Sequence, residues 1–164
     1  QKAKLDFPRL LYIGRIKKEK GIYSLMNLIK DFDFKFKLSI VGGINSNKSK
    51  NKNIKFLNEV AEKKRLIKLY DSHNIFILPS YTEGAPKVIL ESLARKRPVI
   101  IFRNIKHVKL NYKGIFICDR NVFSLKKQIN FIIKNFEIIK NDMNKNKLPT
   151  KKSFQKELLN ILNV

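Results

Sequence analysis

Two glutamates in this chain stand where an acid could do chemistry. Glu83 and Glu91 lie eight positions apart in residues 79–94, which read PSYTEGAPKVILESLA. The preceding residues 74–78 are apolar and rich in β-branched and aromatic side chains, which predicts a buried strand. Pro86 suits the first position of a helix, because its missing N–H costs nothing there. This spacing places one carboxylate after a strand and one in the next helix, at the edge where open α/β sheets bind ligands.

Each glutamate also has a purely structural explanation. Ser80 and Glu83 match the Ser-x-x-Glu capping box, so Glu83 could cap the helix. Glu91 precedes Arg95 by one helical turn and could form a surface ion pair worth only ~0.3–0.5 kcal/mol. Against this, Glu91 lies close to the apolar face of its helix, where an acid needs a partner. There it can accept both hydroxyls of a ribose, while Glu83 in the loop can accept hydroxyls of a sugar.

Two cations follow the first expected strand. Residues 14–21 read GRIKKEKG and set Arg15 and Lys20 between two glycines just before a helix. A helix N-terminus, a guanidinium and an ammonium would together hold a diphosphate, because all three offer N–H donors and positive potential. Surface charge in a lysine-rich protein explains them equally well. Gly42 and Gly43 follow the second strand, where glycine permits either close approach to a ligand or an ordinary turn.

Two common nucleotide-binding motifs are absent. A dinucleotide site would have a glycine triplet in the first loop and an acid near the end of the second strand. The first loop instead holds Arg15 and bulky residues, which disfavours a nicotinamide-dependent dehydrogenase. The Walker pattern of P-loop hydrolases is missing too. His73 and His107 lack the spacing of metal ligands, so we expect no metal and assign both to surface or packing roles.

The apolar pattern predicts alternating strands and helices. Short apolar runs predict strands at residues 9–13, 36–41, 54–57, 74–78, 98–102 and 114–118. Apolar spacings of three and four predict helices at about 22–31, 62–72, 86–95, 123–136, 138–144 and 151–162. Strand and helix repetition implies right-handed crossovers and a parallel sheet covered on both faces. The expected fold class is α/β, a doubly wound, Rossmann-like sheet of about six strands with C-terminal helices.

Composition indicates one soluble domain. The chain has 164 residues, 43% of them hydrophobic, enough to bury a single core. No apolar run approaches the ~20 residues that cross a bilayer, and no signal-like segment precedes the first strand, so we expect a cytoplasmic protein. Because the chain begins at Gln1, we expect a fragment of a longer protein. Cys118 is the single cysteine, and its apolar surroundings predict a buried strand thiol.

The chain is strongly basic, with 36 Lys+Arg, 13 Asp+Glu and a net charge of +23. This balance predicts attraction to nucleic acid, an anionic membrane or a phosphorylated substrate. The lysines are scattered, and residues 45–55 form a lysine-rich loop without aromatic side chains to stack on bases. Nucleic acid is therefore disfavoured.

Taken in order, these motifs resemble those of the retaining nucleotide-sugar glycosyltransferases of the GT-B fold, family 4, also called glycosyl transferases group 1. The similarity covers about residues 10–124. Its most specific part is the Glu-x7-Glu block of residues 83–91 with the Pro-Ser lead-in at 79–80. Arg15 and Lys20 in the first loop are a second specific match. Further matched pieces are residues 38–42, 54–57, 69–70, 77–78 and 97–100.

The resemblance implies that residues 1–164 are the C-terminal, nucleotide-sugar-binding domain of such an enzyme, without its N-terminal acceptor domain. Arg15 and Lys20 would hold the diphosphate and stabilise the leaving nucleotide in place of a metal. Glu83 would contact sugar hydroxyls, and Glu91 would bind the ribose. Other donor-binding residues would be Gly14, Gly42, Gly43, Gly84, Ala85, Pro86, Lys87 and Val88, with the base against Leu57, Asn58 and Val60.

The implied activity is retaining, metal-independent transfer from a UDP- or GDP-linked sugar to a glycan or lipid-linked acceptor, with no cofactor beyond this substrate. The acids would bind and not attack, and the isolated domain would catalyse little. Positive charge also predicts peripheral contact with the anionic inner face of the cell membrane. The alternative is a catalytically inactive, basic α/β module that binds nucleic acid or anionic membrane.

The chain departs from the family at three places. Asn58 stands where the family often has glycine, which affects the expected base contacts. Lys96 replaces the usual glycine before Pro98. Residues 103–107 replace a glycine-rich turn and an acid, so no role is carried over to them.

Overall fold

The structure, a computed structural model, describes residues 7–42, 51–109 and 111–150. In these ranges one sheet has the strand order β3-β2-β1-β4-β5-β6, and all five pairings are parallel. The strands are β1 Arg9–Ile13, β2 Lys37–Val41, β3 Ile54–Leu57, β4 Ile75–Leu78, β5 Val99–Phe102 and β6 Ile115–Cys118. The predicted doubly wound, Rossmann-like sheet is confirmed, and each strand begins within one residue of its predicted start.

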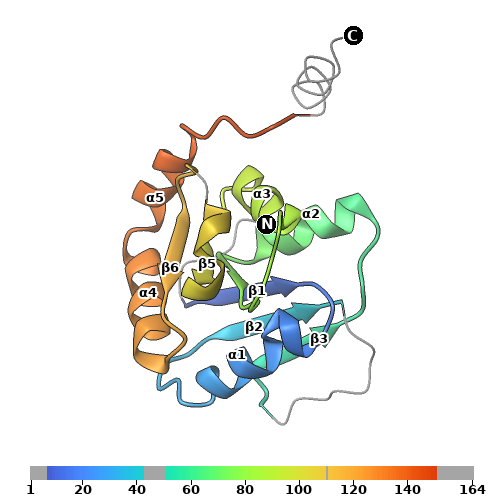
Figure 1. Cartoon of the computed structure of the whole chain (residues 1–164), viewed down its shortest axis with the longest axis vertical. Helices are drawn as coiled ribbons and strands as arrows, with labels where there is room; N and C mark the ends of the chain where they lie inside the picture. Colours follow the sequence, from blue (N-terminus) through green and yellow to red (C-terminus); the bar gives the residue numbers. More distant parts are fainter. Residues whose placement is uncertain (1–6, 43–50, 110, 151–164) are drawn as a thin grey trace.

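Helices cover both faces of this sheet. They are α1 Ile22–Ile29, α2 Lys63–Ser72, α3 Lys87–Ala94, α4 Val122–Lys134 and α5 Phe136–Met143, with 3-10 helices η1 Lys18–Lys20 and η2 Arg103–Lys109. Helix α1 lies on one side of the sheet, and α2 and α3 lie on the other (Figure 1). The predicted helix at 151–162, most of the 45–55 loop and Gly43 lie outside the described residues.

The central strands are apolar on both sides because helices cover both faces of a parallel sheet. All four residues of β4 and all four of β5 are buried. Cys118 at the end of β6 is buried as predicted, and burial raises the pKa of its thiol to about 12. That thiol therefore stays protonated and unreactive at neutral pH.

The chain reverses its direction across the sheet between β1 and β4. These strands pair directly, with Leu10 opposite Ile75 and Leu11 opposite Phe76. From β1 the chain continues to β2 on one side, and from β4 it continues to β5 on the other. Ligands of doubly wound sheets bind at the carboxyl ends of the strands at such a reversal. The loops that follow β1 and β4 are therefore the ones to compare with the predicted site.

Candidate functional site

The loop after β1 packs directly against the end of β4. Gly21, between η1 and α1, has a φ of +67°, and a Cβ added there would collide with the carbonyl group of Pro79. The backbone N–H of Tyr81 donates to the carbonyl of Glu19 at 2.9 Å. Glycine satisfies both the left-handed backbone and the close approach, as no other residue does. The two loops with the predicted cations and acids are thus held together.

This packing brings Lys20 into contact with Glu83. Lys20 Nζ lies 2.8 Å from Glu83 Oε1, and the Ser80 hydroxyl donates to the same oxygen at 2.6 Å. The two charged side chains are only 22% and 10% exposed. Reduced contact with water strengthens the attraction between them relative to a surface pair. The cation and the acid, predicted separately, form one contact.

The capping-box explanation of Glu83 is wrong. Helix α3 begins at Lys87, and Pro86 is its N-cap, not its first helical residue as predicted. Glu83 therefore lies in the loop, too far before the helix to cap it as the third helical residue. The Ser80 hydroxyl instead orients the Glu83 carboxylate. No side chain among the described residues caps the start of α3.

Glu91 is half-buried on α3 and accepts a hydrogen bond from Tyr70. The Tyr70 hydroxyl lies 2.9 Å from Glu91 Oε2. Burial, with the Glu91 charge as a second cause, raises the pKa of Tyr70, so the hydroxyl stays protonated as a donor. The predicted ion pair with Arg95 is absent, because Arg95 pairs with Asp71 at 2.7 Å. The prediction that Glu91 needs a partner is confirmed, and that partner is Tyr70.

Arg15 is exposed, in the same loop after β1 that carries Lys20. Its side chain makes no hydrogen bond or ion pair with any residue that the structure describes. Its carbonyl accepts a 2.8 Å hydrogen bond from the buried hydroxyl of Tyr12. Burial raises the pKa of Tyr12, and the nearby Glu83 charge raises it further. The backbone of Arg15 is fixed, while its guanidinium faces water.

The other predicted donor residues line the same edge of the sheet. Gly42 has a φ of +114°, and a Cβ there would lie 2.6 Å from the carbonyl oxygen of Gly14, which fixes the ends of β1 and β2 close together. After β4, Gly84, Ala85 and Lys87 are exposed, whereas Pro86 and Val88 are half-buried. At the end of β3, Leu57 and Val60 are half-buried and pack on the core, while Asn58 is exposed. Among the described contacts, none joins Glu91, or the residues predicted to contact the base, to Lys20 or Glu83.

Neither histidine is an isolated surface residue. His73 is buried, with Nδ1 donating to the Leu69 carbonyl at 2.7 Å and Nε2 lying 2.8 Å from Ser39 Oγ, which confirms its packing role. His107 is exposed, and its Nε2 donates to the Glu83 carbonyl at 2.7 Å. The predicted surface position of His107 is confirmed, and η2 also places its ring against the backbone of Glu83, a predicted site residue.

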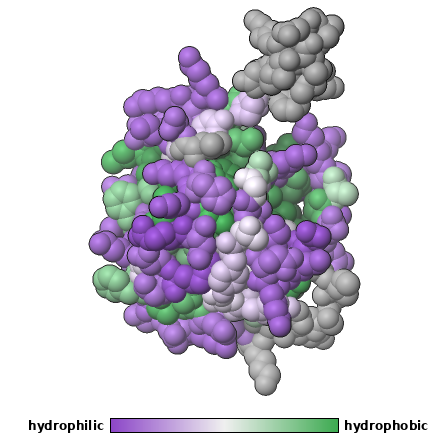
Figure 2. Space-filling model, in the orientation of Figure 1, coloured by the Kyte–Doolittle hydropathy of each residue, from purple (hydrophilic) through white to green (hydrophobic). Residues whose placement is uncertain are grey.

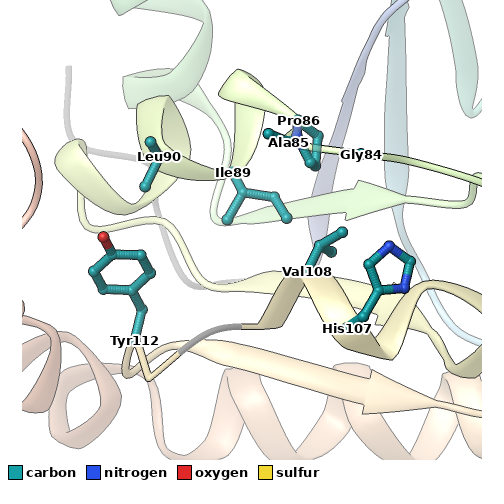
Figure 3. Close-up of a pocket in the computed structure, with 8 residues that line it drawn as sticks. All are labelled: Gly84, Ala85, Pro86, Ile89, Leu90, His107, Val108 and Tyr112. Atoms are coloured by element: carbon teal, nitrogen blue, oxygen red, sulfur yellow. The ribbon is translucent and has the colours of Figure 1, made fainter. Parts of the chain in front are cut away.

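An apolar pocket of about 160 Å³ lies next to the Glu83 loop. It is enclosed by residues 84–86, by Ile89 and Leu90 of α3, and by His107, Val108 and Tyr112 (Figure 3). The part of the chain that the structure describes contains no group of three or more His, Cys, Asp or Glu side chains suited to a metal ion. Nor does any helix in that part have the length and apolar character to cross a membrane.

The fold is a doubly wound, Rossmann-like α/β domain, in which the loops after β1 and β4 lie at the carboxyl edge of the sheet. Residues 7–135 match the family described as glycosyl transferases group 1. The chain belongs to this family, and the resemblance seen in its motifs is confirmed.

Named relatives point the same way. The capsular polysaccharide biosynthesis glycosyltransferase CapM of Staphylococcus aureus is 29% identical over 102 residues, covering 54% of this chain and 26% of that protein. The N,N'-diacetylbacillosaminyl-diphospho-undecaprenol alpha-1,3-N-acetylgalactosaminyltransferase of Campylobacter jejuni is 27% identical over 139 residues, covering 78% of this chain and 36% of that protein. The chain thus spans less than half the length of these relatives.

A solved structure shares the fold. HepE of Anabaena, in complex with UDP-glucose, superposes with a TM-score of 0.73 at 15% sequence identity, over 97% of this chain and 50% of that protein. At that identity the superposition shows the fold, and this chain again corresponds to about half of a larger protein.

Proposed function

We propose that this chain is the C-terminal, donor-binding domain of a GT-B glycosyltransferase and that it binds a UDP- or GDP-linked sugar after β1 and β4. The contact between Lys20 and Glu83 carries the proposal, because it joins a cationic loop to an acidic loop at the reversal point of the sheet. The bound UDP-glucose of the Anabaena neighbour, which shares the fold, supports a nucleotide-sugar ligand.

Arg15 and Lys20 would bind the diphosphate in different ways. The Arg15 guanidinium has no partner among the described residues, so it is available for a bidentate contact with phosphate oxygens. Lys20 is already paired with Glu83. A diphosphate brings more than one negative charge and would compete with Glu83 for the ammonium group. Glu83 would then be free to accept hydrogen bonds from sugar hydroxyls.

The same cations would assist the reaction. When a sugar leaves a nucleoside diphosphate, positive charge develops on the sugar and negative charge on the leaving phosphate. Fixed cations at the phosphate can lower such a barrier by several kcal/mol, a role that a metal ion fills in other enzymes. We therefore propose metal-independent transfer with retention of configuration, in which the departing phosphate assists attack from its own face. Glu83 would bind and would not act as the nucleophile.

The remaining predicted residues would hold the nucleoside and the sugar. Glu91 has one oxygen on Tyr70, so its other oxygen can accept from the ribose. The backbone of residues 84–88 and the uncapped start of α3 would approach the sugar and phosphates, since a helix N-terminus offers N–H donors. Leu57, Asn58 and Val60 would lie against the base, with Gly14, Gly42 and Gly43 beside the phosphates.

We propose a glycan or lipid-linked acceptor, bound by the half of the enzyme outside this chain. The name of the Campylobacter relative describes a sugar donated to a diphospho-undecaprenol lipid, which supports a glycolipid acceptor. The positive charge would favour a cytoplasmic enzyme that binds peripherally to the anionic inner face of the cell membrane. Sedimentation with anionic liposomes at moderate salt tests this placement, and a protein that stays in the supernatant would argue against it.

Calorimetric titration with UDP, GDP and a short RNA at two salt concentrations tests donor binding. Removing a charged phosphate contact costs about 10- to 100-fold in affinity, so Arg15→Ala should lose that much for the nucleoside diphosphates. Lys134→Ala, at an exposed lysine near the end of α4, is the control and should bind like the original chain. Steeply salt-dependent RNA binding that ignores Arg15→Ala would favour the basic module instead.

A further inference from the structure

An arginine that the predicted site does not include lies at the same carboxyl edge of the sheet, after the outermost strand β6. Arg120 lies two positions after Cys118, the last residue of β6. Its guanidinium stacks between two aromatic rings, 4.0 Å from the centroid of Tyr81 and 4.3 Å from that of Phe102. One ring belongs to the loop after β4 and the other ends β5. Cation–π contacts with both rings thus hold the guanidinium in place.

The edges of the same guanidinium reach the loop after β4 again and two further elements, α1 and η2. Arg120 Nη2 donates to the Ser80 carbonyl at 3.1 Å and to Asn104 Oδ1 at 3.3 Å, and Nη1 lies 3.5 Å from the hydroxyl of Ser24 on α1. A Cβ on Gly21 would lie 3.2 Å from Nη1. One side chain therefore touches α1, the loop after β4, the end of β5 and η2.

Arg120 makes these contacts without an acidic partner. Among the described residues no carboxylate forms an ion pair with it, and the adjacent Asp119 pairs with Arg103. Arginine stays charged at any working pH, and a half-buried charge costs free energy unless its N–H groups are used. In Arg120, a carbonyl and an amide oxygen accept hydrogen bonds from these N–H groups, and two aromatic rings contact the guanidinium. This points to a role in holding backbone in place.

The backbone that Arg120 holds carries the Lys20–Glu83 contact. Ser80 offers its carbonyl to Arg120 and its hydroxyl to Glu83 Oε1. The next residue, Tyr81, stacks on Arg120 and donates its N–H to Glu19, beside Lys20. Losing the guanidinium would free both the Ser80 carbonyl and the Tyr81 ring.

We propose that Arg120 is a positioning residue of the donor site, which fixes the Ser80–Tyr81 backbone against α1 and so holds Glu83 beside Lys20. Its effect on ligand affinity rests on the proposed function, but its effect on the loops does not. Arg120 would touch neither sugar nor phosphate.

Amide hydrogen exchange tests the positioning role without any ligand. In Arg120→Ala the Tyr81 N–H, bonded to Glu19, should exchange at least about tenfold faster because the loops separate more often. The Ile100 N–H in buried β5 should be unchanged, which distinguishes local release from global loss of stability. Arg103→Ala is the matched control, since Arg103 also follows a strand of this sheet, β5, but pairs with Asp119. Unchanged Tyr81 exchange in Arg120→Ala would overturn the proposal.

Titration with UDP supplies the second readout. Arg120→Ala should weaken UDP binding by about tenfold, the cost of losing one charge-assisted hydrogen bond that orders the site. Guanidinium ion at tens of millimolar should restore part of the affinity, while sodium chloride at the same ionic strength should not. If Arg120→Ala does not fold, Arg120→Lys replaces it, because lysine keeps the charge but cannot span both rings and the carbonyl. A folded variant that binds UDP as tightly as the original chain would refute the positioning role. If the original chain does not bind UDP, the donor site is refuted instead.

Discussion

Lys20 and Glu83 lie 63 positions apart in the chain and share one hydrogen bond. Sequence reasoning placed both residues in a site because their motifs, taken together and in order, resemble those of the family. It divided the site into a cationic half for phosphates and an acidic half for hydroxyls. In the structure the halves are joined, since Lys20 neutralises Glu83 before any ligand arrives. An anionic ligand would therefore rearrange an existing ion pair.

Several partners of the site residues could not be predicted from the sequence. Tyr12 belongs to an apolar strand and Tyr70 to the apolar side of a mostly polar helix, so both have the pattern of core residues. Their hydroxyls reach Arg15 and Glu91 only because of where the sheet and α2 place them. Arg120 carried a weak signal, because it follows the last strand at its carboxyl end. Its partners come from four other elements, so no local spacing identifies them.

The assignment of Glu91 to the ribose makes a prediction about ligand choice. If Glu91 accepts ribose hydroxyls, the chain should bind UDP more tightly than 2′,3′-dideoxy-UDP, by about tenfold for charge-assisted hydrogen bonds. In Glu91→Gln that preference should shrink, since a neutral amide oxygen accepts more weakly. Competition titrations of both nucleotides measure the ratio. A ratio that Glu91→Gln leaves unchanged would remove Glu91 from the ribose.

His73 makes stability depend on pH. Burial lowers the pKa of this imidazole below its ordinary value of 6.5. As pH falls below 6.5, the unfolded chain takes up a proton that the folded chain excludes, so the free energy of unfolding decreases. The contribution is fully present above that pH. The hydrogen bond from Arg95 lowers the pKa of Asp71, so Asp71 affects the free energy of unfolding only below its ordinary pKa of 3.8. The pH range in which Asp71 affects stability is therefore separate from that of His73.

Urea unfolding at pH 7.5 and 5.5 measures this effect, and the original chain should lose stability at the lower pH. His73→Gln keeps a donor for the Leu69 carbonyl but has no titrating group. Its stability should fall less over the same interval. An equal loss in both proteins would assign the pH dependence to other groups.

At the level of helices and strands, the ends of the strands were predicted best. All six strands end at the predicted residue, because a charged, polar or glycine-containing loop follows each apolar run. Helix limits were less accurate, since the first and last turns lack a clear period: α1 ends at Ile29, two residues before its predicted end, and α5 begins at Phe136, two residues before its predicted start. The short 3-10 helices η1 and η2 were not predicted, because one or two turns of such a helix leave no repeating apolar pattern.

Lys96, which replaces the glycine expected from the family resemblance, has a backbone conformation that suits glycine. It has a φ of +55°, in the left-handed region that glycine adopts most easily. This conformation follows α3, and the Lys96 ammonium donates to the Met143 carbonyl at 3.2 Å, near the end of α5. The usual glycine of the family fits the backbone, while the lysine adds a contact at the cost of strain.

Gly21 sets the distance between the loops after β1 and β4, so Gly21→Ala should lower stability and loosen the site together. The left-handed backbone alone costs about 1–2 kcal/mol for alanine, and the collision with Pro79 adds to this. Gly84→Ala is the matched control, because a Cβ there meets nothing within 4 Å. Urea unfolding measures both variants. Equal stability of the two would contradict the close packing at Gly21.

On the scale of the whole molecule, the positive charge is a poor guide to the site. Hydrophilic residues spread over most of the visible face, with hydrophobic ones scattered between them (Figure 2). The net charge of +23 predicts attraction to anions in general but does not say where they bind. The order of strands in the sheet supplies that location, because it brings the loops after β1 and β4 together.

The comparisons agree with this arrangement at the same scale. The family match covers residues 7–135, which contain every predicted site residue. The chain covers half of the Anabaena protein and a smaller share of the named relatives. Acceptor binding and sugar transfer are therefore proposed for a longer protein, whereas nucleotide binding can be tested on this chain alone.

The central claim is that a nucleoside diphosphate binds across the loops that follow β1 and β4. Amide chemical-shift mapping during a UDP titration tests it most directly, because a chain of 19.3 kDa gives resolved spectra. The account predicts that the largest shifts fall in residues 14–21 and 83–91, and that Lys20→Ala weakens these shifts at equal UDP. Shifts confined to lysines elsewhere, or shifts at these loops that Lys20→Ala leaves unchanged, would contradict it.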